Sequence, residues 1–130
     1  MDINEKFIAI VDDSEPMRCA IISHLANTNY QFIEAVDGRD GIELVKKYSG
    51  KISLLIIDLN MPKLNGIEMM EELATNSIGN DIPKILLTSE PPNEFISLKS
   101  RIPNLKGWMV KPIMEQKFIV IVNKILKDQK

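Results

Sequence analysis

The sequence predicts an α/β fold, a doubly wound parallel sheet of five strands with helices on both faces. Short apolar runs, typical of buried strands, alternate with longer segments of helical period, and polar side chains follow several of the runs. The expected strands span about 6–11, 31–36, 53–58, 83–88 and 107–110. The expected helices span about 15–28, 38–49, 65–76, 93–102 and 114–127. This alternation indicates a parallel sheet, and right-handed crossovers favour the strand order 2-1-3-4-5.

The helices carry signals of their own. Ser14 is the expected N-cap of the first helix, with Pro16 in its first turn. Apolar residues recur at three- and four-residue steps in the first, second and last helices. They are Met17, Ile21 and Leu25; Ile42, Leu44, Val45 and Tyr48; and Phe118, Ile119, Val122, Ile125 and Leu126. The fourth helix is expected to be short, because Pro91 and Pro92 precede it and Pro103 follows it.

Length and composition limit the classes of protein that fit. The expected organisation is one domain, 1–130, in which a hydrophobic content of 45% is sufficient for one core. The net charge of −2 comes from 16 basic and 18 acidic residues without a basic run, which argues against nucleic-acid binding. No apolar stretch approaches the roughly 20 residues that cross a membrane, and the polar N-terminus argues against a secretory signal. Because Cys19 is the single cysteine, a cytoplasmic protein without internal disulfides is expected.

Charged side chains follow three of the expected strands. Asp12 and Asp13 come after the first run, Asp58 ends the third, and Lys111 follows the fifth. Parallel strands carry their carboxyl ends to one edge, so these side chains converge near the first and third strands. Carboxylates that repel one another invite a hard divalent cation such as Mg²⁺. Lys111 and the hydroxyl of Thr88, which ends the fourth run, indicate that the anion handled there is a phosphoryl group.

Taken together, these residues resemble the receiver domain of two-component response regulators over about the whole chain. The matching elements are the Asp12-Asp13 pair, the segment DLNMPKLNG that begins at Asp58, then Thr88, and Lys111 followed by proline. Each element alone is common, whereas the whole set, in this order and at strand ends, is specific. The resemblance implies a flavodoxin-like (βα)5 fold and a single-domain, chemotaxis-regulator-like signalling switch. Such a protein is not an enzyme beyond catalysing its own phosphoryl uptake and loss.

The resemblance also implies a role for each site residue. Asp58 would accept the phosphoryl group from a sensor histidine kinase or a phosphotransfer protein, and Lys111 and Thr88 would bind its oxygens. The ligands of Mg²⁺ would be Asp13 and Asp58 directly, Asp12 through water, and Asn60 through its main-chain carbonyl. The bond between Lys111 and Pro112 is expected to be cis.

Two further pairs of residues would control the phosphorylated state. Asn60 and Glu90 would set its lifetime, since they flank the path of attacking water. Movement of Thr88 would be coupled to Trp108, three residues before the lysine. This coupling would change the binding of an effector, of unknown identity, to the face formed by the fourth helix, the fifth strand and the last helix. Asn104 is expected to take the left-handed conformation in the turn before that strand.

Other functions remain open. The chain also fits the N-terminal receiver of a longer DNA-binding response regulator. A small Mg²⁺-dependent phosphohydrolase would use Asp58 as a covalent nucleophile, but that class usually has an acid where Asn60 stands. A pseudo-receiver would bind partners without phosphorylation, although every chemical group is present. Purely structural roles are a helix cap for Asp12-Asp13, a solvated surface position for Lys111 and core filling for Trp108.

Overall fold

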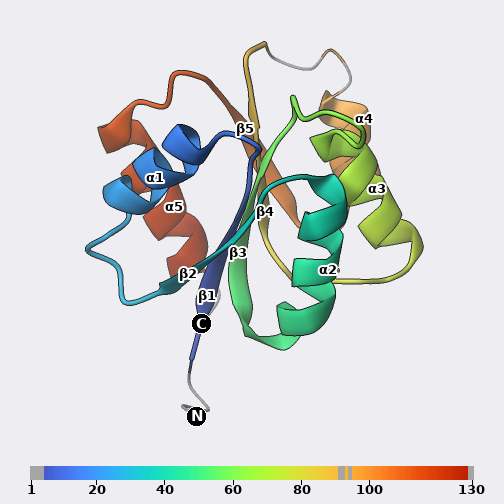
Figure 1. The fold of residues 1–130 in the computed structure, drawn as a ribbon, viewed down its shortest axis with the longest axis horizontal. Helices are drawn as coiled ribbons and strands as arrows, with labels where there is room; N and C mark the ends of the chain where they lie inside the picture. The colour runs from blue at the N-terminus through green and yellow to red at the C-terminus, as the bar shows by residue number, and fades with distance from the viewer. Residues whose placement is uncertain (1–4, 91–92, 94, 129–130) are drawn as a thin grey trace.

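The computed structural model describes residues 5–90, 93 and 95–128. Five parallel strands form one sheet in the order β2-β1-β3-β4-β5, which confirms the predicted fold class and topology (Figure 1). The strands are β1 Phe7–Val11, β2 Gln31–Ala35, β3 Ile52–Asp58, β4 Lys84–Thr88 and β5 Leu105–Val110. The helices are α1 Glu15–His24, α2 Gly38–Tyr48, α3 Gly66–Thr75, α4 Phe95–Arg101 and α5 Glu115–Lys127, with a 3-10 turn at Ser49–Lys51.

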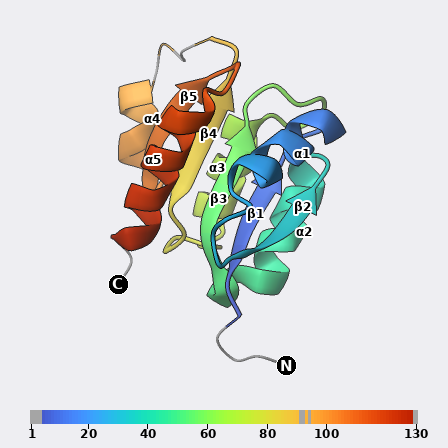
Figure 2. The ribbon, with the colours of Figure 1, turned by 90° about the vertical axis from the view of Figure 1, so that its left-hand side faces the viewer.

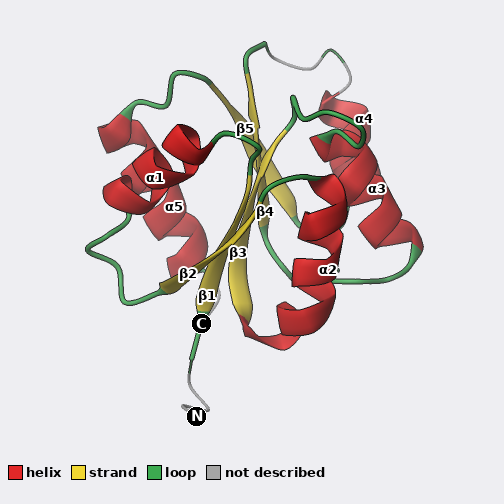
Figure 3. Cartoon of the chain, in the orientation of Figure 1, coloured by secondary structure: helices red, strands yellow, loops and turns green. Residues whose placement is uncertain are grey.

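The molecule has three layers, with the sheet in the middle. Helices α1 and α5 cover one face of the sheet, and α2, α3 and α4 cover the other (Figures 1 and 2). Figure 3 shows the same layers by type of structure, with the helices outside the strands. Strands β1 and β3 are buried along their whole length, because successive side chains enter opposite cores. Of the helices in the part of the chain described, none has the length and apolar character of a membrane span.

Most boundaries lie within one residue of the predicted ones, and three regions differ by more or touch undescribed residues. Helix α1 ends at His24 rather than near 28, because the chain turns there and Thr28 bonds back to the carbonyl of Leu25 through both its N–H and its hydroxyl. Strand β5 begins at Leu105, two residues earlier than predicted. Asn104 has the expected left-handed conformation, with φ of 60°, and its carbonyl accepts from the Lys84 N–H, which aligns β5 with β4. Helix α4 is short, as expected, while Pro91, Pro92 and Glu94 lie outside the described residues.

A buried lysine closes the amino-terminal edge of the sheet. Lys84 is 2% exposed, and its ammonium donates to the carbonyls of Gly79, Ile82 and Pro103 at 2.9, 2.9 and 3.0 Å. These carbonyls come from the loop before β4 and the turn before β5. Burial lowers the pKa of Lys84 to about 8, while the nearby carboxylate of Asp81 acts in the opposite direction. The ammonium therefore joins two connections at the edge opposite the acidic residues.

Candidate functional site

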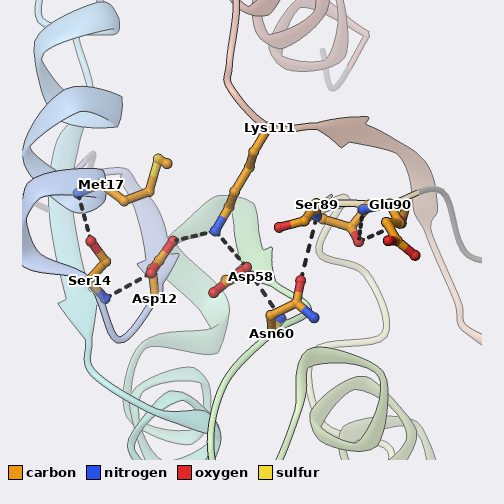
Figure 4. A network of polar contacts seen from close by, with 9 residues as sticks. Asp12, Ser14, Met17, Asp58, Asn60, Ser89, Glu90 and Lys111 are labelled. Carbon is orange, nitrogen blue, oxygen red and sulfur yellow. Dashed lines mark hydrogen bonds and ion pairs between the residues drawn. The ribbon is translucent and has the colours of Figure 1, made fainter.

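The structure brings Asp12, Asp58 and Lys111 into contact at the carboxyl edge of the sheet. The Lys111 ammonium lies 2.8 Å from Oδ1 of Asp58 and 3.6 Å from Oδ2 of Asp12 (Figure 4). Its main-chain N–H donates to the carbonyl of Thr88 at 2.8 Å, which holds the start of the following loop against the end of β4. The bond between Lys111 and Pro112 is cis, as predicted. A lysine that follows the edge strand β5 thus reaches residues at the carboxyl ends of β1 and β3.

The three aspartates form a compact acidic cluster. Asp12 and Asp58 are 1% and 2% exposed, Asp13 is exposed, and one carboxylate oxygen from each lies within 4.8 Å of the others. Burial is the main reason that the pKa of Asp12 is raised, and the charges of Asp58 and Asp13 act in the same direction. The Ser14 N–H and the Lys111 ammonium oppose this shift in pKa.

One oxygen in this cluster lacks a hydrogen bond. Among the described residues, none donates a hydrogen bond to Oδ2 of Asp12, although this atom is fully buried. A buried charged oxygen without a donor is costly, and a second and a third carboxylate beside it raise the cost. Hard divalent cations take such oxygen ligands and neutralise their charge. The donor set therefore fits Mg²⁺, with Lys111 supplying a partial counter-charge in the structure described.

The loop after β1 is held by contacts at several atoms. Oδ1 of Asp12 accepts from the Ser14 N–H at 2.8 Å, and the Ser14 hydroxyl accepts from the Met17 N–H at 3.2 Å, which confirms Ser14 as the N-cap of α1 (Figure 4). The guanidinium of Arg18 donates to the main-chain carbonyl of Asp12 at 2.7 Å. Sequence reasoning missed Arg18, although its position on the apolar side of the helix, three residues before Ile21, was a usable signal.

The loop after Asp58 depends on a glycine. A Cβ atom added to Gly66 would lie 2.5 Å from the main-chain oxygen of Asp58, closer than real contacts allow. Helix α3 starts at this glycine, and Asn65 caps it in a reciprocal capping box with Glu68. The N–H of Asn60 points back to Oδ1 of Asp58 at 3.3 Å. Gly66 therefore allows α3 to begin directly against the main chain of Asp58 and the loop that carries Asn60.

Thr88 is buried at the end of β4, with its hydroxyl turned toward the following loop. The hydroxyl donates to the Glu90 carbonyl at 2.6 Å and accepts from the Glu90 N–H at 3.2 Å. The Ser89 N–H approaches Oδ1 of Asn60 at 3.5 Å (Figure 4). The structure thus brings the ends of β3 and β4 together at Asn60, while the Thr88 hydroxyl is engaged by its own turn.

Trp108 lies on the edge strand and is half-buried. Its ring packs edge-to-face against Phe95 of α4, with centroids 5.9 Å apart and planes at 69°. It also lines a cavity of about 370 Å³ between β5 and α5, to which Gly107, Ile121 and Ile125 contribute. The ring therefore connects α4 to the edge of the sheet, and the residue also borders an opening on the α5 side.

Comparison with known proteins agrees with this geometry. The family model of the response regulator receiver domain matches residues 8–123. Chemotaxis protein CheY of Treponema pallidum is 29% identical over 121 residues, which cover 92% of this chain and 82% of the relative. Protein PilH of Pseudomonas aeruginosa is 26% identical over 119 residues, covering 92% and 96%. A probable transcriptional regulator, ycf27 of Cyanophora paradoxa, is 28% identical, and the match spans 98% of this chain and 51% of that protein.

Solved structures show the same fold. Chemotaxis protein CheY4 of Vibrio cholerae superposes with a TM-score of 0.79 at 25% identity, covering 93% of this chain and 98% of that one. The receiver domain of a putative LuxO repressor from Vibrio parahaemolyticus gives 0.82 at 21% identity, covering 95% and 92%, and supports the fold alone. With the strand order, the acidic edge and the family match in agreement, the chain belongs to the response regulator receiver domains, which are signalling modules of two-component systems.

Proposed function

We propose that this receiver is a phosphorylation-controlled switch in which Asp58 accepts a phosphoryl group. The observation that carries the proposal is the contact of the Lys111 ammonium with two buried carboxylates, Asp12 and Asp58, beside the exposed Asp13. The donor would be a phosphohistidine on a sensor histidine kinase or a phosphotransfer protein. An oxygen of Asp58 would form the bond to phosphorus while the P–N bond breaks, and its electron pair would return to the imidazole nitrogen.

The difficulty of this reaction is electrostatic. A carboxylate that is already ionised needs no general base, but it repels an anionic donor. Mg²⁺ would supply positive charge to the transferring oxygens, held by Asp13 and Asp58 directly, by Asp12 through water and by the Asn60 carbonyl. The Lys111 ammonium, which lies 2.8 Å from Asp58, would pair with the oxygens that arrive there. Asn60 and Glu90, which lie at the ends of β3 and β4, would set how readily water reaches the product.

The switch would begin at Thr88. Its hydroxyl must leave the Glu90 main chain to donate to a phosphoryl oxygen, and that exchange would release the turn at Ser89 and Glu90. Trp108 packs on Phe95 at the start of α4, so a shift that reaches this helix would alter the surroundings of the ring. Phosphorylation would act by favouring one arrangement; moving a population from 1:99 to 99:1 takes about 5.5 kcal/mol.

The effector would bind the face formed by α4, β5 and α5, which Figure 2 shows together on one side of the molecule. Among the described residues, four of the five exposed large apolar side chains lie on or beside these elements: Ile96, Val110, Met114 and Val120. Exposed apolar side chains on neighbouring elements favour this face as an interaction site. Seven of the nine charged residues in 95–128 are basic, an enrichment that the overall mixture of charges conceals and that favours an acidic partner. The proposed location is the cytoplasm, where the kinase domain would meet this protein.

A second candidate is the receiver of a longer transcriptional regulator. The match that covers only 51% of a probable transcriptional regulator favours it, and the reading frame beyond residue 130 decides between the two. A phosphohydrolase is disfavoured, because the side chain of Asn60 is an amide that cannot protonate a leaving group.

The deciding experiment is intact-protein mass spectrometry after incubation with Mg²⁺ and a small acyl-phosphate donor. The wild type should gain one phosphoryl group, Asp58→Asn should gain none, and chelation of the cation should slow the reaction strongly. Asp81→Asn is the matched control, since Asp81 is exposed and lies near the opposite edge of the sheet. An unmodified wild type, or equal labelling of Asp58→Asn, would contradict the proposal.

A further inference from the structure

Arg18 is a buried cation whose contacts lead to the acidic cluster without touching its carboxylates. Its side chain is 11% exposed, although α1 is a surface helix. Nε donates to Oε1 of Glu34 at 2.9 Å, and Nη1 donates to the main-chain carbonyl of Asp12 at 2.7 Å. Burying a guanidinium is costly unless its donors are used. Both bonds are therefore features of the fold that a flexible surface arginine would not maintain.

These contacts complete a clamp around Asp12. Its N–H donates to the carbonyl of Ala35 at 3.1 Å, its carbonyl accepts from Arg18, and its Oδ1 accepts from the Ser14 N–H at 2.8 Å. Glu34 and Ala35 are consecutive residues of β2, so the strand and the helix hold the two peptide units on either side of the Asp12 Cα atom. The oxygen left for a cation is Oδ2, the atom for which no donor is found among the described residues. The direction of this oxygen depends on the orientation of the Asp12 backbone that these bonds hold.

We propose that Arg18, oriented by Glu34, is a positioning residue that aims the carboxylates of Asp12 and Asp13 for a divalent cation and sets the preference for Mg²⁺. This inference rests on the cation site proposed above. The hydrogen bonds of the guanidinium go to the Asp12 carbonyl and to the Glu34 carboxylate, so Arg18 meets the acidic cluster through the main chain. Its effect is therefore on geometry. Mg²⁺ demands near-ideal octahedral ligands, whereas Ca²⁺ accepts irregular ones.

The test is calorimetric titration of the metal-free protein with MgCl₂ and, separately, with CaCl₂. Arg18→Met should weaken Mg²⁺ binding about tenfold, the low end for partners that orient metal ligands, and Ca²⁺ binding by less than about threefold. Glu34→Gln keeps the arginine but loses the charge-assisted bond, so a smaller, about threefold, loss for Mg²⁺ is expected. Arg39→Met is the matched control, because it removes an exposed arginine paired with Glu72 and should leave both affinities unchanged.

Three results would overturn the inference. The first is that Arg18→Met binds Mg²⁺ as tightly as the control Arg39→Met does. The second is that Arg18→Met loses equal affinity for Mg²⁺ and Ca²⁺, which a general loosening of the fold would produce. If Arg18→Met does not fold, Glu34→Gln decides, since Glu34 is 43% exposed and tolerates an isosteric amide. The third result is that the ratio of Mg²⁺ affinity to Ca²⁺ affinity in Glu34→Gln equals that of the wild type. A wild type that binds neither cation would instead remove the proposed site itself.

Discussion

Asp12→Asn should stabilise the protein in the absence of divalent cations. At an effective dielectric constant of about 20, each carboxylate within 4.8 Å repels Asp12 by about 3.5 kcal/mol, and the ammonium at 3.6 Å attracts it by about 4.6 kcal/mol. Asp58 is buried and acts at this strength, while the exposed Asp13 is screened by water and contributes about half. The balance is a net repulsion of about 1 kcal/mol, to which the desolvation of the unbonded Oδ2 adds about 1 kcal/mol.

The assay is urea denaturation at neutral pH in the presence of a chelator. The free energy of unfolding of Asp12→Asn should exceed that of the wild type by about 2 kcal/mol, with an unchanged slope. Mg²⁺ should then stabilise the wild type, because it binds only the folded state, and should stabilise the variant much less. Glu43→Gln is the control, since it removes an equal charge from an exposed residue in a solvated ion pair.

The stability difference between Asp12→Asn and the wild type should change with pH in a direction that can be measured. The pKa of Asp12 is raised by folding above its ordinary value of 3.8, so the folded chain binds the proton more tightly than the unfolded one. Stability from this group is then complete below pH 3.8 and is lost as pH rises through the folded pKa. The advantage of Asp12→Asn should accordingly grow as pH rises from acid to neutral. A variant that is no more stable than the wild type with chelator at neutral pH would refute this reasoning.

Three other predictions concern the frame around the site. Gly66→Ala should lower the free energy of unfolding by about 1–3 kcal/mol and slow phosphorylation, because its Cβ meets the Asp58 carbonyl. Gly50→Ala is the control, since open space surrounds that position, and it should change neither chemical denaturation nor labelling. Lys84→Met should lower the free energy of unfolding by about 2–4 kcal/mol, since three carbonyls lose their donor. Replacing the exposed Lys106 by Met should lower it by under about 0.5 kcal/mol, and equal losses would be inconsistent with the buried ammonium. Thr88→Val should still be phosphorylated but should lose the phosphorylation-dependent change in fluorescence of the single tryptophan, and a retained change would separate Thr88 from the switch.

The carboxyl edge of the sheet was predictable because each of its charged residues directly follows an apolar run. Once the runs are strands of one parallel sheet, topology alone brings Asp12, Asp58 and Lys111 to a common edge. The family match confirms the predicted family, and the strand order confirms the predicted topology. The roles in phosphoryl transfer stay predictions until the labelling experiment is done.

What the sequence could not reveal depends on partners that are distant along the chain or that are main-chain atoms. Arg18 meets Glu34 across 16 positions, and its other acceptor is a backbone carbonyl, which has no signature in the sequence. Lys84 stands at the start of an apolar run, where a charge looks like a simple strand end. Its three acceptors are again carbonyls, one of them 19 residues away. The early start of β5 has the same origin, because it follows from a hydrogen bond between main-chain atoms of Lys84 and Asn104.

Positive charge stabilises oxygen atoms at both ends of the sheet, but its source differs between the two ends. At the base, the ammonium of Lys84 is covalently tethered to β4, so no change in the ionic content of the solvent can remove it. At the top, the Lys111 ammonium lies 3.6 Å from Oδ2 of Asp12, and this oxygen, which no described residue hydrogen-bonds, can also take a cation from solution. Below its pKa of about 8, the Lys84 ammonium at the base needs no dissolved cation, whereas the charge balance at the top responds to one. A signalling module benefits from this division, since the amino-terminal edge of the sheet keeps its structure while the carboxyl edge exchanges its counter-ions.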